Sequence, residues 1–424
     1  MATATEGWTS ELARELADDA LERFLRYVRM DTQSDPLSDS YPSTAKQLDL
    51  LRLLADELRE IGLDDAALDE HGYVIGTLPP TIERDVSAIG LIAHVDTSPD
   101  VSGASVDPQI VQFEGRRIPL LRDPEQALDP EADRELTRHI GHDIVTTDGT
   151  TLLGADNKSG IAEIIAAVAY LRRHPEIEHG PVRVGFTPDE EIGGGTTYFD
   201  VDAFGAEVAF TLDGSTAGEL QDETFGALKV TVTFHGRSAH PGRAKGQLVN
   251  AIKLASAFVE HLPREGLSPE TTEGREGFVH PSRIEGSVEG CEVTLILRDF
   301  DEEKLAGYEA LVRRLADETV AGEPHASVEV EVERQYRNMH EYLKDVPRAT
   351  SVAEEAIRAE GLEPLRTSIR GGTDGARLSE RGLPTPNLFT GQQALHSRHE
   401  WICVRDLGSA AATIVRLVER WASA

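Results

Sequence analysis

Short apolar runs alternate with amphipathic segments through the first half of the chain, and this alternation restricts the fold more than any other feature of the sequence. Apolar residues recur with the spacing of one helical face in residues 10–30, 44–61 and 158–173. Apolar runs with the length of buried strands occupy 88–95, 182–186 and 208–212. Strands that alternate with helices form a sheet with helices packed on its faces, so we predict an α/β domain.

The middle third of the chain changes to a period of two. Apolar and polar residues alternate in 227–234, 293–297 and 328–332, as in strands that expose one face to water. Segments with helical spacing, 247–262 and 302–315, can cover the other face. We therefore predict an α+β domain inserted into the α/β domain, with the boundaries 1–220, 221–335 and 336–424. After the insertion, the pattern predicts helices over 350–360 and 405–421 and strands over 365–369 and 387–389.

The length and charge of the chain narrow the class of protein. At 424 residues, the chain exceeds what one hydrophobic core usually serves. The net charge of −33 argues against a nucleic-acid partner, because phosphate binding needs clustered positive charge. Cys291 and Cys403 are isolated, so we expect neither a zinc knuckle nor a disulfide framework, and a reducing cytoplasm fits best. We recognise no signal peptide and no bilayer-spanning run, so we expect no membrane role and no export.

Residues that commonly bind metal ions or transfer protons follow the predicted strands. They are His94 and Asp96, Asp156, Glu190 with Glu191, Asp213, and His396 with His399 near the C-terminus. Open α/β sheets bind their ligands at the carboxyl ends of the strands, which is where these motifs are expected. His94 and Asp96 are two residues apart and lie on the same face of an extended backbone. His94 can therefore bind a metal while Asp96 fixes the tautomer of its ring.

The adjacent pair Glu190 and Glu191 is the most informative of these motifs. Neighbouring side chains leave the backbone in different directions, so one carboxylate can bind a cation while the other remains free to transfer protons. Three glycines, 193–195, follow the pair and permit close approach to a ligand. Each motif also has a structural interpretation, such as a solvated acidic turn for the glutamates, a helix N-cap for Asp156 and a turn for Asp213. Together, at the strand ends of one α/β pattern, they predict a hydrolytic metal site.

The motifs, their order and the inserted domain resemble those of the dinuclear zinc metallopeptidases that include aminoacylase-type and carboxypeptidase-type exopeptidases. The resemblance rests on strings such as A-H-V-D-T-S-P-D from Ala93, L-L-G-A-D-N-K-S-G-I-A-E from Leu152, T-P-D-E-E-I-G from Thr187, I-R-G-G-T-D-G-A from Ile369 and H-S-R-H-E-W from His396. It runs nearly end to end and is strongest for the cytoplasmic aminotripeptidases of the family. It implies a zinc-exopeptidase-like catalytic domain with helices on both faces of a mixed sheet, and an inserted α+β domain that acts as a lid.

The resemblance also implies roles for individual residues. It makes His94, Asp156 and Asp213 the ligands of one metal ion, and Asp156, Glu191 and His396 those of a second, with Asp156 as the bridge. Glu190 becomes the general base that takes a proton from the attacking water, and Asp96 supports His94. The expected cofactor is two Zn²⁺ ions per subunit, although carboxylate-rich sites also accept Co²⁺ or Mn²⁺.

In the inserted domain, the resemblance implies residues that contact a small peptide substrate. His240 is expected to stabilise the tetrahedral intermediate in its own or a neighbouring subunit, with Asn250 nearby in sequence. Arg298 and Arg370 are expected to bind the substrate carboxylate, which a planar guanidinium fits well. Without the resemblance, His240 is interpreted as a turn residue and each arginine as half of a surface salt bridge. The resemblance also allows a homodimer formed through the inserted domain.

The implied function is the release of the N-terminal residue from tripeptides. A related dipeptidase or N-acyl-amino-acid deacylase would use the same metals on a different amide, and a non-catalytic relative would keep only the fold. An uncoordinated carboxylate at Glu190 argues against the non-catalytic alternative. The chain departs from the family at Asn157, where many relatives have Asp, and at 392–395, where relatives are more aromatic. The second difference adjoins His396 and bears on substrate fit, not on metal binding.

Overall fold

The computed structural model describes residues 7–423, and these form two compact units. The first unit comprises residues 7–222 with 342–367 and 373–423, and the second comprises 223–341 with 368–372. For comparison, the sequence pattern predicts an insertion over 221–335. Within residues 7–423, none of the helices combines the length and the apolar character that a membrane span requires.

A mixed eight-stranded sheet forms the centre of the first unit, with the strand order β1-β2-β8-β3-β9-β16-β10-β15. The strands β8, β3, β9 and β16 run parallel, whereas β2 and β10 are antiparallel to their neighbours β8 and β16. The bounds are β1 (Ala67–Leu68), β2 (Val74–Leu78), β3 (Ile89–His94), β8 (Val182–Thr187), β9 (Val208–Gly214), β10 (Glu219–Thr224), β15 (Leu365–Ile369) and β16 (Asn387–Phe389).

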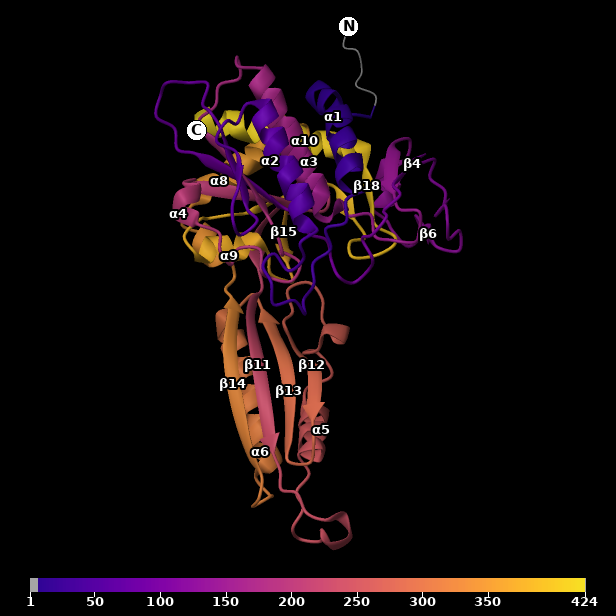
Figure 1. Ribbon diagram of the computed structural model, residues 1–424, viewed down its shortest axis with the longest axis vertical. Coiled ribbons are helices and arrows are strands. Elements are labelled where there is room, and N and C mark those ends of the chain that lie inside the picture. Colours follow the sequence, from indigo (N-terminus) through magenta and orange to yellow (C-terminus); the bar gives the residue numbers. More distant parts are fainter. Residues whose placement is uncertain (1–6, 424) are drawn as a thin grey trace. The chain divides into compact units, whose positions relative to one another are not determined.

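Helices cover both faces of this sheet, as the family resemblance predicts. Leu91 and Phe210 pack in the large core with α1, α2, α3, α8 and α10, whereas Ile92 and Ala209 belong to a second core on the other side with α4 and α9. In Figure 1, α1, α3 and α10 lie side by side. The helices are α1 (Glu11–Tyr27), α2 (Gln47–Ile61), α3 (Ala155–Arg173), α4 (Val201–Phe204), α7 (His340–Leu343), α8 (Pro347–Ala359), α9 (Asp374–Glu380) and α10 (Val404–Ser423). The predicted α/β class is therefore confirmed.

A small sheet that the sequence pattern does not predict joins the C-terminal part of the first unit to residues 109–146. Its order is β17-β18-β7-β4, and a separate hairpin pairs β5 with β6. The strands are β4 (Gln109–Gln112), β5 (Ile118–Pro119), β6 (Ala127–Leu128), β7 (Asp143–Thr146), β17 (Gln392–Gln393) and β18 (Trp401–Cys403), with the short helix η1 (Leu136–His139). Strands of two to four residues are too short to show a hydrophobic period.

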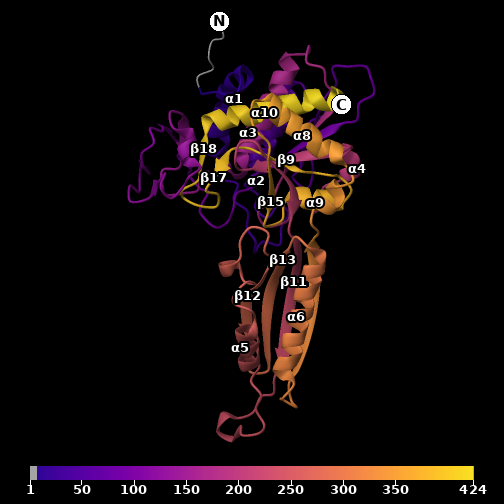
Figure 2. The same cartoon turned by 180° about the vertical axis from the view of Figure 1, so that it is seen from behind.

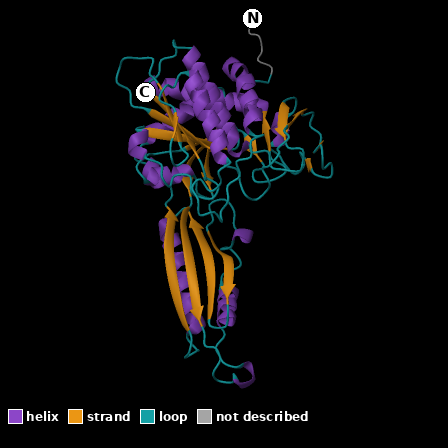
Figure 3. Cartoon of the chain, viewed as in Figure 1, coloured by secondary structure: helices purple, strands orange, loops and turns teal. Residues whose placement is uncertain are grey.

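The second unit is an antiparallel four-stranded sheet with the order β12-β13-β11-β14. The predicted strands over 227–234, 293–297 and 328–332 are confirmed as parts of β11 (Gly226–His235), β13 (Gly290–Asp299) and β14 (Ser327–Tyr336), and β12 (Phe278–Gly286) is an addition. Figures 2 and 3 show α5 (Ala251–His261) and α6 (Glu302–Val320) against one face of the sheet. The short helices η2 (Pro241–Arg243) and η3 (Pro269–Thr271) lie in its loops.

Candidate metal centre

The five residues predicted to bind metal come together in the first unit. His94 is the last residue of β3, Asp213 lies near the end of β9, and Glu191 follows β8. These strands are parallel, so their carboxyl ends meet at one edge of the sheet. Asp156, from the start of α3, and His396, from the loop between β17 and β18, complete the group.

Asp156 stands between the two histidines. His94 Nε2 lies 3.1 Å from Asp156 Oδ1 and 3.7 Å from Asp213 Oδ1. His396 Nε2 lies 3.2 Å from the other Asp156 oxygen, Oδ2, and 2.9 Å from Glu191 Oε2. The donor atoms therefore form two sets that share one carboxylate, which is the arrangement needed to hold two cations.

Two observations fit divalent cations at these positions. Glu191 Oε1 is buried and has no hydrogen-bond partner among the described residues. The neighbouring acids also oppose one another's ionisation, since burial and the charge of Asp156 raise the pKa of Glu191 to about 8 and raise the pKa of Asp213. Hydrogen bonds with Asp156 and Glu191 raise the pKa of His396 to about 11. Carboxylates and imidazoles are the donors that zinc and similar cations take, so the residues fit the metals that the sequence predicts.

Asp96 contacts the backbone of Glu190 and Glu191 as well as the ring of His94, which is the only partner that the sequence predicts for it. Its side chain is fully buried, and Oδ1 lies 3.3 Å from His94 Nδ1. The backbone N–H of Glu190 donates to Oδ1 at 2.9 Å, and that of Glu191 donates to Oδ2 at 3.2 Å. The backbone carbonyl of Asp96 also lies within hydrogen-bond distance of His94 Nδ1, at 3.1 Å. Asp96 thus orients the His94 ring through its backbone and side chain, and its carboxylate holds the turn that carries both glutamates.

Glu190 lies beside the donor sets without belonging to either. Its Oε1 accepts the backbone N–H of Asp374, at the start of α9, at 3.2 Å. The Asp374 side chain is buried and accepts the Thr187 hydroxyl at 2.9 Å. Burial, with an opposing contribution from His94 and a supporting one from Asp374, raises the pKa of Glu190 well above its ordinary value. An uncoordinated acid with a raised pKa is suited to general base catalysis.

Sequence reasoning misses two residues that support the ligands. Gln392 Nε2 donates to Oδ1 and to the backbone carbonyl of Asp213, each at 3.1 Å. Glu400 accepts backbone N–H groups at the start of α3, including that of Asp156. Glu400 stands in the quoted string from His396, but no local pattern shows where its side chain points. His399, noted beside His396, belongs to neither donor set among the described residues.

A second cluster of potential ligands, His139, Cys403 and Asp406, is unsuited to a metal ion. All three are buried, and His139 Nε2 lies 3.5 Å from Asp406 Oδ2. Arg405 donates to His139 Nδ1 at 3.1 Å, so Nδ1 must be the acceptor and the proton of the neutral ring must lie on Nε2. Binding a cation through Nε2 would require loss of that proton as well as of the hydrogen bond.

The residues predicted to bind substrate lie in the second unit, where each has local contacts. His240 Nδ1 accepts the backbone N–H of Gly242 at 3.1 Å, and Asn250 caps α5 by accepting the N–H of Ile252 at 2.9 Å. Arg298 lies over the ring of Tyr336, 5.0 Å from its centroid. Arg370 donates to the backbone carbonyls of residues 272, 274 and 276. Both arginines line one pocket of about 560 Å³.

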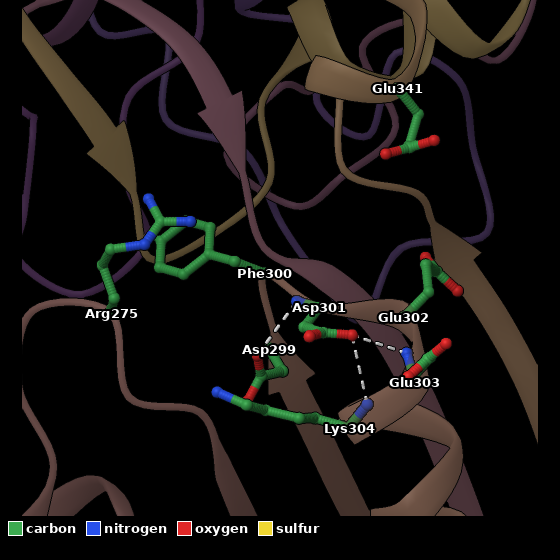
Figure 4. A pocket seen from close by; sticks show the side chains of 8 residues that line it. All are labelled: Arg275, Asp299, Phe300, Asp301, Glu302, Glu303, Lys304 and Glu341. Carbon is green, nitrogen blue, oxygen red and sulfur yellow. Dashed lines mark hydrogen bonds between the residues drawn. The ribbon is translucent and has the colours of Figure 1, made fainter.

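A pocket of about 650 Å³ at the start of α6 is lined mainly by acidic residues (Figure 4). Two of its carboxylates make hydrogen bonds within the turn that leads into the helix. Asp301 caps the helix by accepting the N–H groups of Glu303 and Lys304. Asp299 accepts the N–H of Asp301 at 2.9 Å and the hydroxyl of Tyr308 at 2.6 Å. These carboxylates therefore already hold the turn into α6.

Comparisons with known proteins find relatives over nearly the whole chain. A family model described as a peptidase dimerisation domain matches residues 222–323. Peptidase T from Clostridium acetobutylicum is 47% identical over 406 residues, which cover 96% of this chain and 99% of that protein. Peptidase T from Geobacillus thermodenitrificans is 45% identical, with coverage of 95% and 98%.

Solved structures share the fold. Aminopeptidase PepT from Bacillus cereus superposes with a TM-score of 0.74 at 23% identity, covering 96% of this chain and 99% of that one. A tripeptidase from Staphylococcus aureus gives 0.76 at 21% identity, with coverage of 96% and 99%. A dinuclear metal-binding peptidase of the M20 family from Bacillus subtilis gives 0.64 at 14% identity, with coverage of 96% and 98%. Because the chain is 45–47% identical to these curated peptidase T sequences over nearly its full length, it belongs to the peptidase T family of hydrolases that act on peptide bonds.

Proposed function

We propose that this protein is a metal-dependent aminopeptidase that releases the N-terminal residue from tripeptides. The observation that carries the proposal is the pair of donor sets sharing Asp156, with the uncoordinated carboxylate of Glu190 beside them. Its curated relatives are named peptidase T, and one solved relative is described as a tripeptidase, which supports the tripeptide substrate. We also propose that it acts in the cytoplasm, because its two isolated, free cysteines fit a reducing compartment.

His94, Asp156 and Asp213 would hold one cation, and Asp156, Glu191 and His396 the other. Zinc is the first choice for these donors, and cobalt or manganese would also fit. When bound, such a pair of cations polarises the scissile carbonyl and lowers the pKa of water.

Glu190 would then act as the proton carrier. It removes a proton from the attacking water as the water oxygen bonds to the peptide carbonyl carbon, and it delivers that proton to the departing amine as the C–N bond breaks. The N–H of Asp374 holds one Glu190 oxygen, which leaves the other for the water. Asp96 supports the reaction by fixing the backbone of both glutamates and the ring of His94.

Residues of the second unit would bind the rest of the peptide. We assign the substrate carboxylate to Arg298 and Arg370, because both line the same pocket and guanidinium pairs well with carboxylate. His240 would hydrogen-bond the developing oxyanion, with Asn250 as a further polar contact. The match of residues 222–323 to a peptidase dimerisation domain supports a homodimer through this unit.

A substrate panel tests the proposal. The zinc-loaded enzyme is incubated with a free tripeptide, its N-acetylated form, a dipeptide and a tetrapeptide, and the products are separated by chromatography. We expect the free tripeptide to be cleaved fastest, with release of its N-terminal residue. Faster cleavage of the acetylated peptide would instead support an N-acyl-amino-acid deacylase, and faster cleavage of the dipeptide would support a dipeptidase.

A further inference from the structure

Glu400 is a buried carboxylate, and both of its oxygens accept hydrogen bonds from one short stretch of backbone. Only 1% of the residue is exposed. Oε2 accepts the N–H groups of Leu153 and Gly154 at 2.7 and 2.8 Å, and Oε1 accepts the N–H of Asp156 at 3.0 Å. The third of these N–H groups belongs to the residue that faces both histidines of the metal centre.

The start of α3 depends on this distant carboxylate. Leu153 and Gly154 precede α3, and Asp156 and Asn157 have non-helical φ and ψ, so the buried N–H groups of this irregular backbone need an acceptor from elsewhere. Gly154, at the N-cap, has no side chain to serve, and no side-chain cap is present at that position. Glu400, 244 residues away from Asp156 in the chain, supplies the acceptor.

The backbone N–H of Glu400 donates to the carbonyl of Ser397 at 3.4 Å, in the loop that carries His396. Ser397 Oγ donates to the carbonyl of Ala394 at 2.6 Å and accepts the N–H of His399 at 3.1 Å. His396 itself has a φ of 56°, in the left-handed region that a residue with a Cβ adopts only when its surroundings hold it there. Anchoring the Glu400 side chain therefore restrains the end of the loop that carries His396.

We propose that Glu400 is a positioning residue of the metal centre, which holds the Asp156 carboxylate and the His396 imidazole at the separation that two cations require. The inference rests on the proposed function, because it assumes that these two side chains bind metal. It adds a residue that touches neither metal nor substrate and acts through the backbone of one ligand and the loop of another. Residues that orient metal ligands in this way typically contribute 10–100-fold to metal affinity.

The test compares the variant Glu400→Gln with Glu360→Gln. Glutamine has one acceptor oxygen and one NH₂ group. The NH₂ group, which cannot accept a hydrogen bond, must therefore face either the N–H of Asp156 or the N–H groups of Leu153 and Gly154. Glu360 is a matched control, because it is also buried in the first unit but accepts the hydroxyls of residues 9 and 10, and it belongs to neither donor set. Each protein is stripped of metal with a chelator and titrated with Zn²⁺ against a competing dye. The Co²⁺-loaded forms are compared by visible absorption.

We expect Glu400→Gln to bind Zn²⁺ about 10–100-fold more weakly than wild type and to show an altered Co²⁺ spectrum. Glu360→Gln should bind Zn²⁺ as wild type does, even where its melting temperature falls. The inference would be overturned if Glu400→Gln bound Zn²⁺ within twofold of wild type, or if Glu360→Gln lost as much Zn²⁺ affinity as Glu400→Gln. Neither result would contradict the proposed cleavage of tripeptides. A wild-type chain that binds fewer than two ions would overturn the proposed function as well. If Glu400→Gln does not fold, Glu400→Asp, which keeps the charge but withdraws it by one methylene, is judged by the same thresholds.

Discussion

The polar residues of the metal centre and those proposed to bind substrate are held in opposite ways. In the first unit, side chains from distant parts of the sequence approach one another, and Glu191 keeps a buried oxygen with no partner among the described residues. In the second unit, His240 and Asn250 accept backbone N–H groups two residues away, and Arg370 donates to backbone carbonyls. Ligands of an ion must converge and retain free lone pairs, whereas groups that meet a substrate can remain part of local structure until it arrives.

The replacement Glu190→Gln should produce the largest effect. The amide cannot take a proton from water, so we expect kcat for a tripeptide to fall by about 10²–10⁴-fold. Because Glu190 lies outside both donor sets, the metal content per chain should stay at the wild-type value. Steady-state kinetics and elemental analysis of the same preparation measure the two quantities. Turnover close to that of wild type would remove Glu190 from the mechanism, and loss of metal would make it a ligand.

The replacement Arg298→Ala should affect substrate binding more than chemistry. A hydrogen bond to a charged group contributes about 1.5–3 kcal/mol, so KM for a free tripeptide should rise by roughly 10–100-fold with a smaller change in kcat. The same tripeptide with an amidated C-terminus is the control, since it lacks the carboxylate and should respond little to the replacement. An equal rise in KM for both peptides would show that Arg298 does not bind the carboxylate.

Arg370 differs from Arg298 because its guanidinium donates to the backbone of the loop 272–276. Arg370→Lys keeps the charge but loses this multiple bonding. We therefore expect a lower melting temperature together with a higher KM, whereas Arg298→Lys should change KM with little effect on melting. Calorimetry with kinetics on both variants checks the contrast. Identical melting of the two variants would contradict it.

Glu163 contrasts with the ligands of the metal centre. Among the described residues, both of its buried carboxyl oxygens lack a hydrogen-bond partner, and it belongs to no converging donor group. Burial and the charge of Asp406 raise its pKa well above the ordinary value of 4.5. Above pH 4.5 the unfolded chain loses this proton while the folded chain keeps it, so the free energy of unfolding falls as pH rises. The slope for one proton is up to about 1.4 kcal/mol per pH unit.

The variant Glu163→Gln should lack that slope and should be more stable than wild type at pH 8. Urea unfolding at several pH values between 5 and 8, with and without chelator, measures the difference between the two proteins. A difference that does not change with pH would show that Glu163 is ionised in the folded state. A difference that appears only with metal present would place an ion at this carboxyl.

The sequence could predict the α/β sheet and the residues near its strand ends, because the carboxyl ends of parallel strands gather at one edge. It could not predict how Glu400 and Gln392 support the ligands or how Asp374 holds Glu190, since each acts on a residue about 180 or more positions away through bonds that leave no local pattern. The small sheet of β4, β7, β17 and β18 could not be predicted either, because its strands are short and pair with strands that are distant in the sequence. Convergence of side chains is a tertiary property, and hydrophobic periods do not encode it.

The proposed mechanism depends on Asp156 being shared between two cations. A crystal of the zinc-loaded protein, with anomalous scattering measured on both sides of the zinc absorption edge, tests it most directly. We expect two zinc peaks about 3.5–4 Å apart, one beside His94 and one beside His396, with an oxygen of Asp156 bonded to each. A single peak, or two peaks without Asp156 between them, would contradict it.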